Sequence, residues 1–168
     1  PPWPLALMPR TLQPFFSANE RDAAFQSNHI DGTVIDYTGA IIQHASGVDL
    51  RLTSRCDAPF YLLASPSSAI TTVAGLKNHS IAVSQNTVID YVVDQALASV
   101  QIPANEVTKV EINRIPIRYE LLVGNQIDAT GLPNPLALLA EKAGAVSLTS
   151  NTTLNLSITG IMFSQSAL

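Results

Sequence analysis

The stretch NHIDGTVID, residues 28–36, returns later in the chain as NQIDATGLP, residues 125–133. Placing one on the other sets an offset of 97 residues, and the match extends without a gap over residues 21–47 and 118–144. Seven of the 27 aligned pairs are identical: Arg21 with Arg118, Asn28 with Asn125, Ile30 with Ile127, Asp31 with Asp128, Thr33 with Thr130, Ala40 with Ala137 and Gly47 with Gly144. Because internal repeats decide architecture, the sequence predicts two similar halves.

Composition narrows the class of protein. Of the 168 residues, 46% are hydrophobic and 13% are charged, which is typical of a globular chain with a real core. The net charge of −4 and the pI near 5.2, with no Lys/Arg cluster, argue against nucleic-acid binding. No apolar run approaches the roughly 20 residues of a membrane span. We therefore expect a globular protein that does not bind nucleic acid.

Cysteine and histidine give little sign of special chemistry. Cys56 is the single cysteine, so an internal disulfide and a Cys-rich metal site are excluded. A small, partly buried thiol is the more common state of such a residue than a reactive nucleophile. The three histidines have no metal-binding spacing. We expect no metal and no cofactor.

Helical and strand patterns alternate along the chain. Helices are expected at 17–27, 37–45, 87–100, 115–125 and 134–144, and strands at 30–36, 49–54, 60–65, 80–85, 107–112 and 127–132. A further short strand is possible within residues 4–9. Such alternation predicts βαβ units and parallel sheets covered by helices.

The two copies differ where their strands end. The first continues as VIDY and the second as GLPNP. Ligands of open α/β sheets bind at the carboxyl ends of the strands. We therefore expect the repeated residues to form a scaffold and the differing residues at the strand ends to form a binding site. Two similar lobes with unlike rims favour a cleft that holds an asymmetric small molecule. The matched Arg21 and Arg118 are interpreted as scaffold, and the matched Asp31 and Asp128 as holding a neighbouring helix end or loop.

Three segments carry a family resemblance: residues 17–40, 75–92 and 112–137. Together they resemble substrate-binding proteins of ABC importers, in the group that binds nitrate, sulfonates, taurine and thiamine precursors, over about residues 13–165. The resemblance implies a type 2 periplasmic-binding-protein fold, in which crossover strands join two α/β lobes that close over ligand by a hinge. It assigns residues 1–64 plus 158–168 to one lobe and 65–157 to the other.

The resemblance also implies the protein's surroundings. The partners would be a small-molecule ligand and an ABC permease in the membrane, and the protein would be a monomer. It would lie in the periplasm or at the outer face of the cytoplasmic membrane, where a lipid anchor could hold it. Members of the family are longer than this chain, so we expect an incomplete version of the fold, with its first lobe unfinished.

Site candidates follow from the strand ends and helix starts. Ser84, Asn86 and Thr87 precede a helix whose free N–H groups favour a polar or anionic group, although simple capping explains them almost as well. Ser17 and Asn19 hold the equivalent place in the first half. The remaining ligand-binding candidates are Met8, Asp36, Tyr37, Thr38, Asn113, Arg114 and Asn134.

The side-chain groups of three candidates favour different kinds of ligand. The carboxylate of Asp36 could meet an amine or an aminopyrimidine, or could be a solvated turn residue. Arg114 could pair with a sulfonate or a carboxylate, yet an arginine at such a place is more often a surface charge. Asn134, in a rim stiffened by prolines, offers both a donor and an acceptor.

Three classes of function remain. Solute capture without chemistry is favoured, because no nucleophile–base pair is evident; the ligand would be a neutral heterocycle such as a thiamine-pathway pyrimidine, with sulfonates second. The alternative is an enzyme on the same scaffold acting on a pyrimidine or menaquinone precursor, which would need Cys56, His29 or Lys109 in the cleft. A sensor or interaction domain within a longer protein is a third possibility.

Overall fold

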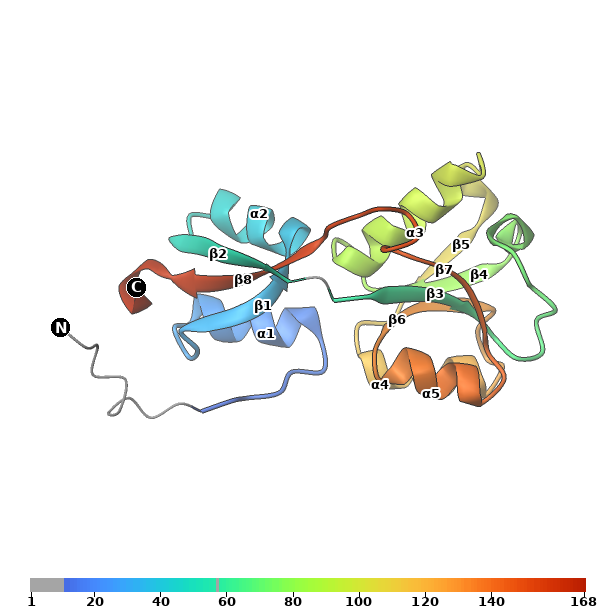
Figure 1. The fold of residues 1–168 in the computed structure, drawn as a ribbon, viewed down its shortest axis with the longest axis horizontal. Helices are drawn as coiled ribbons and strands as arrows, with labels where there is room; N and C mark the ends of the chain where they lie inside the picture. The colour runs from blue at the N-terminus through green and yellow to red at the C-terminus, as the bar shows by residue number, and fades with distance from the viewer. Residues whose placement is uncertain (1–10, 57) are drawn as a thin grey trace.

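The computed structural model describes residues 11–56 and 58–168, which form two α/β lobes side by side (Figure 1). The first lobe holds a three-stranded sheet in the order β1-β8-β2 and the second a five-stranded sheet in the order β5-β4-β6-β3-β7. The elements of the first lobe are α1 (Ala18–Gln26), β1 (Gly32–Asp36), α2 (Tyr37–Ala45), β2 (Leu50–Cys56) and β8 (Thr159–Ser164). Those of the second are β3 (Phe60–Ala64), β4 (Ser80–Val83), α3 (Val88–Ser99), β5 (Thr108–Glu111), α4 (Ile115–Val123), β6 (Ala129–Pro133), α5 (Leu136–Lys142) and β7 (Val146–Ser150). The expected two-lobed α/β fold is confirmed.

The repeat found in the sequence is also a repeat of structure. Moving the bounds of α1 and β1 by 97 residues gives those of α4 and β6. Asn28 and Asn125 both have positive φ, at 56° and 57°, just after their helices. Gly47 and Gly144 follow the second helix of each copy with φ of 92° and 97°, values that L side chains rarely adopt. The two copies lie in separate sheets, as the sequence predicts.

Strand directions differ from the expected parallel sheets. In the first sheet β8 pairs antiparallel with both β1 and β2. In the second, β4 is parallel to β5 and β6, whereas β3 is antiparallel to β6 and β7. The reason is that the chain passes between the lobes twice, so β3 and β8 enter their sheets from the other lobe rather than through a βαβ unit. The sequence analysis did not include β7 or β8 among the strands.

One boundary of the lobes needs correction. The sequence assignment placed residues 60–64 in the first lobe, but β3 hydrogen-bonds with β6 and β7 of the second sheet. β8 lies in the first sheet, where the same assignment put residues 158–168. From here on, the first lobe means residues 17–56 and 159–168, and the second lobe residues 60–157.

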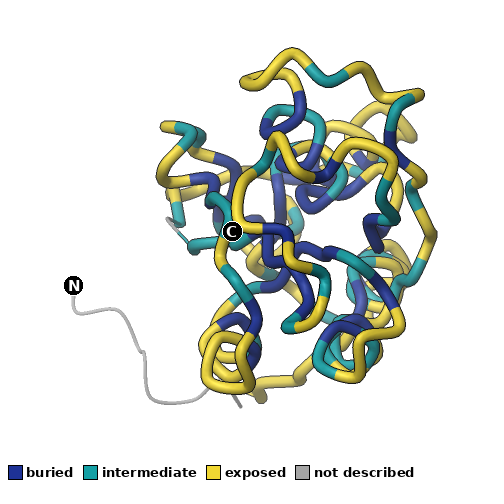
Figure 2. The backbone as a smooth tube through the Cα atoms, turned by 90° about the vertical axis from the view of Figure 1, so that its right-hand side faces the viewer, coloured by how far each residue is buried: buried dark blue, intermediate teal, exposed yellow. Residues whose placement is uncertain are grey.

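Each lobe has its own apolar core, and buried stretches of the chain lie toward the inside of the molecule (Figure 2). In the second lobe, α3 packs on one face of the sheet through Val92, Val93 and Leu97, while α4 and α5 cover the other. In the first lobe one cluster, centred on Ile35 and Met162, joins α1 and α2 to the sheet. No helix within the described ranges is long and apolar enough to cross a membrane.

Candidate functional site

A cavity of about 330 Å³ lies between α2 of the first lobe and α3 of the second. Both helices follow the carboxyl end of a strand: α2 starts directly after β1, and α3 starts after β4 and the four residues 84–87. The lining residues are Thr38, Ile41, Ile42, Asn86, Thr87, Asp90, Tyr91 and Asp94. Three of the predicted site residues, Thr38, Asn86 and Thr87, therefore come together from different lobes.

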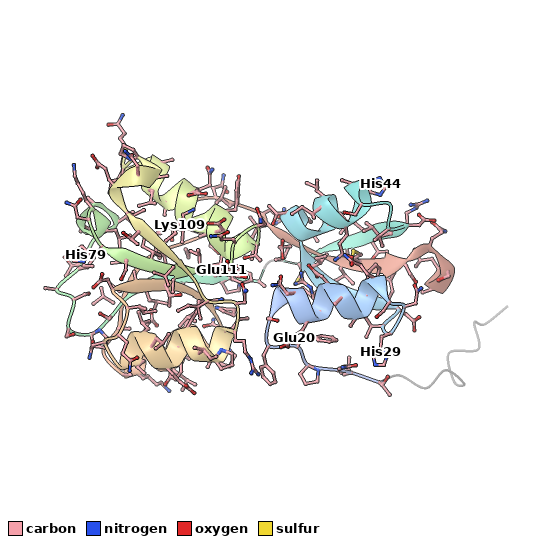
Figure 3. All side chains as sticks on the ribbon, turned by 180° about the vertical axis from the view of Figure 1, so that it is seen from behind. Glu20, His29, His44, His79, Lys109 and Glu111 are labelled. Atoms are coloured by element: carbon pink, nitrogen blue, oxygen red, sulfur yellow. The ribbon has the colours of Figure 1, made fainter. Side chains whose placement is uncertain are left out.

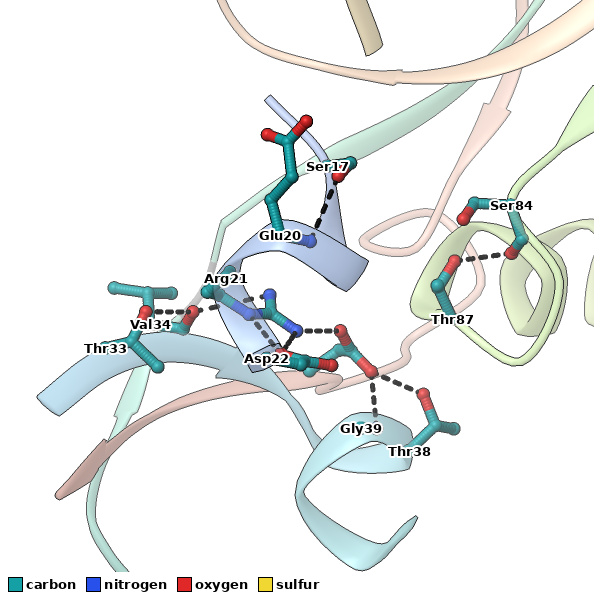
Figure 4. A network of polar contacts seen from close by, with 11 residues as sticks. Ser17, Glu20, Arg21, Asp22, Thr33, Val34, Thr38, Gly39, Ser84 and Thr87 are labelled. Carbon is teal, nitrogen blue, oxygen red and sulfur yellow. Dashed lines mark hydrogen bonds and ion pairs between the residues drawn. The ribbon is translucent and has the colours of Figure 1, made fainter. Parts of the chain in front are cut away.

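The wall from the first lobe is fixed by Asp36, which is only 3% exposed. One carboxylate oxygen accepts the N–H of Gly39 and the hydroxyl of Thr38, both at 2.6 Å, and the other faces Arg21 at 3.3 Å (Figure 4). This is the geometry of a helix N-cap with an ion pair added. Asp36 thus holds Thr38 at the cavity, and both of its oxygens already have protein partners.

The wall from the second lobe is built around Ser84. Its hydroxyl donates to Oδ1 of Asn113 at 2.7 Å, which ties the ends of β4 and β5 together. Its carbonyl accepts the hydroxyl of Thr87 at 2.7 Å (Figure 4). Asn86 has a φ of 59°, and its N–H donates to Asp90 at 3.2 Å.

The start of α3 has no side-chain cap. Thr87 occupies the cap position, but its hydroxyl is turned back to Ser84, and no described side chain accepts from the first turn. The first N–H groups of a helix have no partner within it, and they carry the positive end of the helix dipole. The end of α3 that meets the cavity can therefore take a polar or anionic group.

The starts of α1 and α4, which are equivalent in the repeat, lie close to each other. Ser17 caps α1 by accepting the N–H of Glu20 at 3.2 Å. The N–H of Ile115, the first residue of α4, donates to the carbonyl of Phe16 at 3.1 Å. Because Arg114 takes the cap position of α4, it lies beside this contact between lobes, and it is exposed.

The other predicted residues do not line the cavity. Tyr37 begins α2, and its N–H donates to the carbonyl of Ile158 at 2.9 Å. Asn19 and Asn134 are exposed, on α1 and just before α5. Met8 lies outside the described residues.

Sequence reasoning missed five of the lining residues: Ile41, Ile42, Asp90, Tyr91 and Asp94. The carboxylates of Asp90 and Asp94 both accept from Nζ of Lys109, each at 2.6 Å. Lys109, on β5, is labelled in Figure 3. Burial alone lowers the pKa of Lys109, but the hydrogen bonds and charges of the two carboxylates outweigh it and leave the pKa raised. The signal in the sequence was the four-residue spacing of the two acids, which puts them on one side of α3.

The two matched arginines differ in charge balance. Arg21 pairs with Asp22 at 2.7 Å and Asp36 at 3.3 Å. Arg118, which is 1% exposed, donates only to carbonyls, those of Ile112 at 2.7 Å, Gly131 at 3.3 Å and Asn113 at 3.4 Å. Desolvation lowers the pKa of Arg118 to about 10, so it remains charged at neutral pH. Within the described residues this cation has no carboxylate partner.

Two α/β lobes, joined by two crossovers and with an open cavity between them, have the architecture of the periplasmic-binding-protein fold. No family model and no curated protein matches the chain. Among solved structures, it is similar to the alkanesulfonate-binding protein SsuA from Xanthomonas axonopodis pv. citri bound to MOPS, with a TM-score of 0.78 and 21% identity over 90% of this chain and 54% of that one.

Two further structures show the same fold. The periplasmic aliphatic sulphonate binding protein SsuA from Escherichia coli matches with a TM-score of 0.74 and 21% identity, over 91% of this chain and 54% of that one. The ligand binding component of an ABC-type import system from Staphylococcus aureus matches with a TM-score of 0.76 and 12% identity, over 89% and 53%. The chain spans about half the length of these proteins.

Proposed function

We propose that this chain belongs to the solute-binding component of an ABC importer, and that it captures a small molecule with an anionic group by closure of its two lobes. The carrying observation is the cavity itself, because its walls come from helix starts in different lobes. A rotation that brings α2 and α3 together would enclose a ligand there without any chemical step.

The anionic ligand class is supported by the uncapped start of α3 and by similarity, and the two carboxylates of the lining, Asp90 and Asp94, are both paired with Lys109. The start of α3 offers uncapped N–H groups. Arg118, in the same lobe but outside the cavity lining, is a buried cation with no carboxylate partner among the described residues. Two of the similar solved structures are sulfonate-binding proteins. These features move a sulfonate ahead of the neutral heterocycle favoured by the sequence.

The site would use the predicted residues in two ways. Thr38, Asn86 and Thr87 would contact the ligand directly, since they line the cavity. The second group, which would shape the cleft around it or complete it on closure, consists of Met8, Ser17, Asn19, Asp36, Tyr37, Ser84, Asn113, Arg114 and Asn134.

The moving parts, location and partner that we propose are those that the resemblance to ABC-importer binding proteins implies. The moving bodies would be the two lobes, 17–56 with 159–168 and 60–157. The protein would act as a monomer outside the cytoplasmic membrane, either in the periplasm or tethered there, and would deliver its solute to a membrane permease.

Calorimetric titration with a panel of ligands tests the proposal. The panel would hold short alkanesulfonates with and without an amine, MOPS, aminopyrimidines and amino acids. We expect saturable binding of a sulfonate, and a substitution of Asn86→Gly should weaken it by roughly tenfold, the loss of one hydrogen bond to a charged group. Glycine keeps the positive φ of Asn86, so the backbone is not strained.

A matched control is available on the same lobe. Asn78 also has a positive φ, at 65°, and is exposed away from the cavity. Asn78→Gly should leave the affinity unchanged. Absence of binding across the whole panel, or equal losses in the two variants, would contradict the proposed site.

A further inference from the structure

Two crossovers join the lobes (Figure 1). The first leads from Cys56, at the end of β2, to Phe60, at the start of β3. The second leads from Ser150, at the end of β7, to Thr159, at the start of β8. Any movement of one lobe against the other must bend both.

On the side of the second lobe, Asn151 ties the two crossovers together. Its side chain is buried, with 4% of the residue exposed. Its Oδ1 accepts the N–H of Phe60 at 2.8 Å, and its Nδ2 donates to the carbonyl of Leu156 at 3.2 Å. Its own N–H donates to the carbonyl of Phe60 at 3.1 Å, and its carbonyl accepts the N–H of Leu156 at 2.8 Å. One residue therefore fixes the first residue after one crossover and a late residue of the other.

On the side of the first lobe, Thr159 makes the corresponding tie. It is 3% exposed, pairs with Cys56 in the sheet, and donates its hydroxyl to the carbonyl of Cys56. These ties leave residues 157 and 158 of the second crossover between Leu156 and Thr159.

This stretch of the second crossover leads directly to the cavity. Ile158 is part of the core of the second lobe, yet its carbonyl accepts the N–H of Tyr37 in the first lobe. Tyr37 also lies against β8, because a Cβ on Gly160 would come within 2.9 Å of its ring. Thr38, the next residue, lines the cavity. A change in the bend is transmitted to the cavity wall over one peptide unit.

We propose that Asn151 is a positioning residue for lobe closure: by clamping both crossovers on the second lobe, it makes them bend as one hinge. This proposal rests on the proposed function, in which the lobes close over a solute. The motion of one lobe against the other can nevertheless be measured without ligand. A failure of the clamp is thus distinguishable from a failure of the solute-binding assignment.

The test measures the distance distribution between labels on the two lobes. Cysteines replace the exposed His44 on α2 and Ala98 on α3, in a Cys56→Ser background, and double electron–electron resonance is recorded without ligand. Asn151→Asp keeps the acceptor for Phe60 but removes the donor to Leu156. We expect the width of the distribution to increase by roughly twofold, because the second crossover then bends independently.

The matched control is Asn155→Asp, the same chemical change in the same turn. Asn155 is exposed and has a φ of 55°, which aspartate tolerates. It should leave the distribution as in the parent.

Asn151→Ala, which removes both side-chain bonds, should broaden the distribution further than Asn151→Asp. Folded variants of Asn151 with the width of the parent would overturn the proposal. So would loss of cooperative unfolding in both variants, which would make Asn151 a residue for the stability of the second lobe and not for its positioning.

Discussion

The segments α1–β1–α2 and α4–β6–α5 have the same backbone plan but different partners around their matched arginines. Their first helices and strands coincide at an offset of 97 residues, and their left-handed positions match. At the end of the strand, however, Asp36 of the first copy corresponds to Pro133 of the second. The first arginine is therefore paired with carboxylates, whereas among the described residues the second donates to carbonyls alone. The residues that set backbone shape are repeated, while the carboxylates that pair with the matched arginine are not.

The largest difference between the copies is expected at the arginines. Arg118→Met should lower the free energy of unfolding by about 2–4 kcal/mol, because up to three carbonyls lose their donor and relief from burying a charge does not offset this. Arg21→Met should lower the free energy of unfolding by about 1–2 kcal/mol. The Arg21 side chain is 15% exposed, and in the variant Asp36 still accepts hydrogen bonds from Thr38 and Gly39. Urea unfolding of both variants measures the two values.

Equal losses for the two arginines would break the comparison, because they would mean that both act as the same structural tie. One hydrogen bond is shared by both copies. Arg21 donates to the carbonyl of Val34 at 3.5 Å, and Arg118 donates to the equivalent carbonyl of Gly131 at 3.3 Å. The predicted difference therefore comes from the carboxylates of Asp22 and Asp36, which contact Arg21 and have no counterpart at Arg118.

Much of this scaffold was predictable because it is determined locally. Asn28, Asn125, Gly47 and Gly144 mark backbone positions that few other residues tolerate, so the helix ends could be predicted from the sequence. The direction of β3 and β8 was not predictable, because antiparallel pairing here results from the chain's passage between the lobes. No local pattern encodes that passage.

The site was predictable only in part, for a related reason. Thr38, Asn86 and Thr87 could be found because strand ends and helix starts have sequence signals. Ile41 and Tyr91 could not, because their side chains line a cavity only when a helix from the other lobe lies opposite.

The glycines after the second helices should instead behave alike. Gly47→Ala and Gly144→Ala should each lower the free energy of unfolding by about 1–2 kcal/mol, because both need φ above 90°. A Cβ at Gly47 would meet nothing within 4 Å, and one at Gly144 only Pro66 at 3.5 Å, an ordinary contact. Thermal unfolding checks this, and a difference of more than about 1 kcal/mol between them would mean that backbone strain is not the shared cause.

The matched threonines should separate again, with a smaller effect. Thr130 is fully buried and donates its hydroxyl to the carbonyl of Ala82 at 2.8 Å. Thr130→Val should cost about 1 kcal/mol, the net value of one hydrogen bond. The hydroxyl of Thr33 reaches only the carbonyl of the adjacent Val34 at 3.1 Å, near solvent, so Thr33→Val should change stability by less than about 0.5 kcal/mol. A larger loss at Thr33 would show that the two strands are constrained in the same way.

The smallest effect, and the most specific, is expected at the matched aspartates. Asp128 accepts from the N–H and hydroxyl of Ser80, both at 2.8 Å, and from His79 at 3.3 Å. The hydrogen bond from the Ser80 backbone, with those from the side chains of Ser80 and His79, holds the pKa of Asp128 below its usual 3.8. Because the folded pKa is lowered, this stabilisation is present above pH 3.8 and is lost as the pH falls through the folded pKa.

Asp128→Asn should therefore lower the melting temperature modestly at pH 7, since the carboxylate is 37% exposed and screened by solvent. The difference from the parent should shrink steadily as the pH falls below about 4. Asp31, exposed and without a side-chain hydrogen bond among the described contacts, serves as the matched control, and Asp31→Asn should follow the parent at every pH. A pH-independent loss in Asp128→Asn would mean that the shape of the side chain, and not its charge, holds the start of β4.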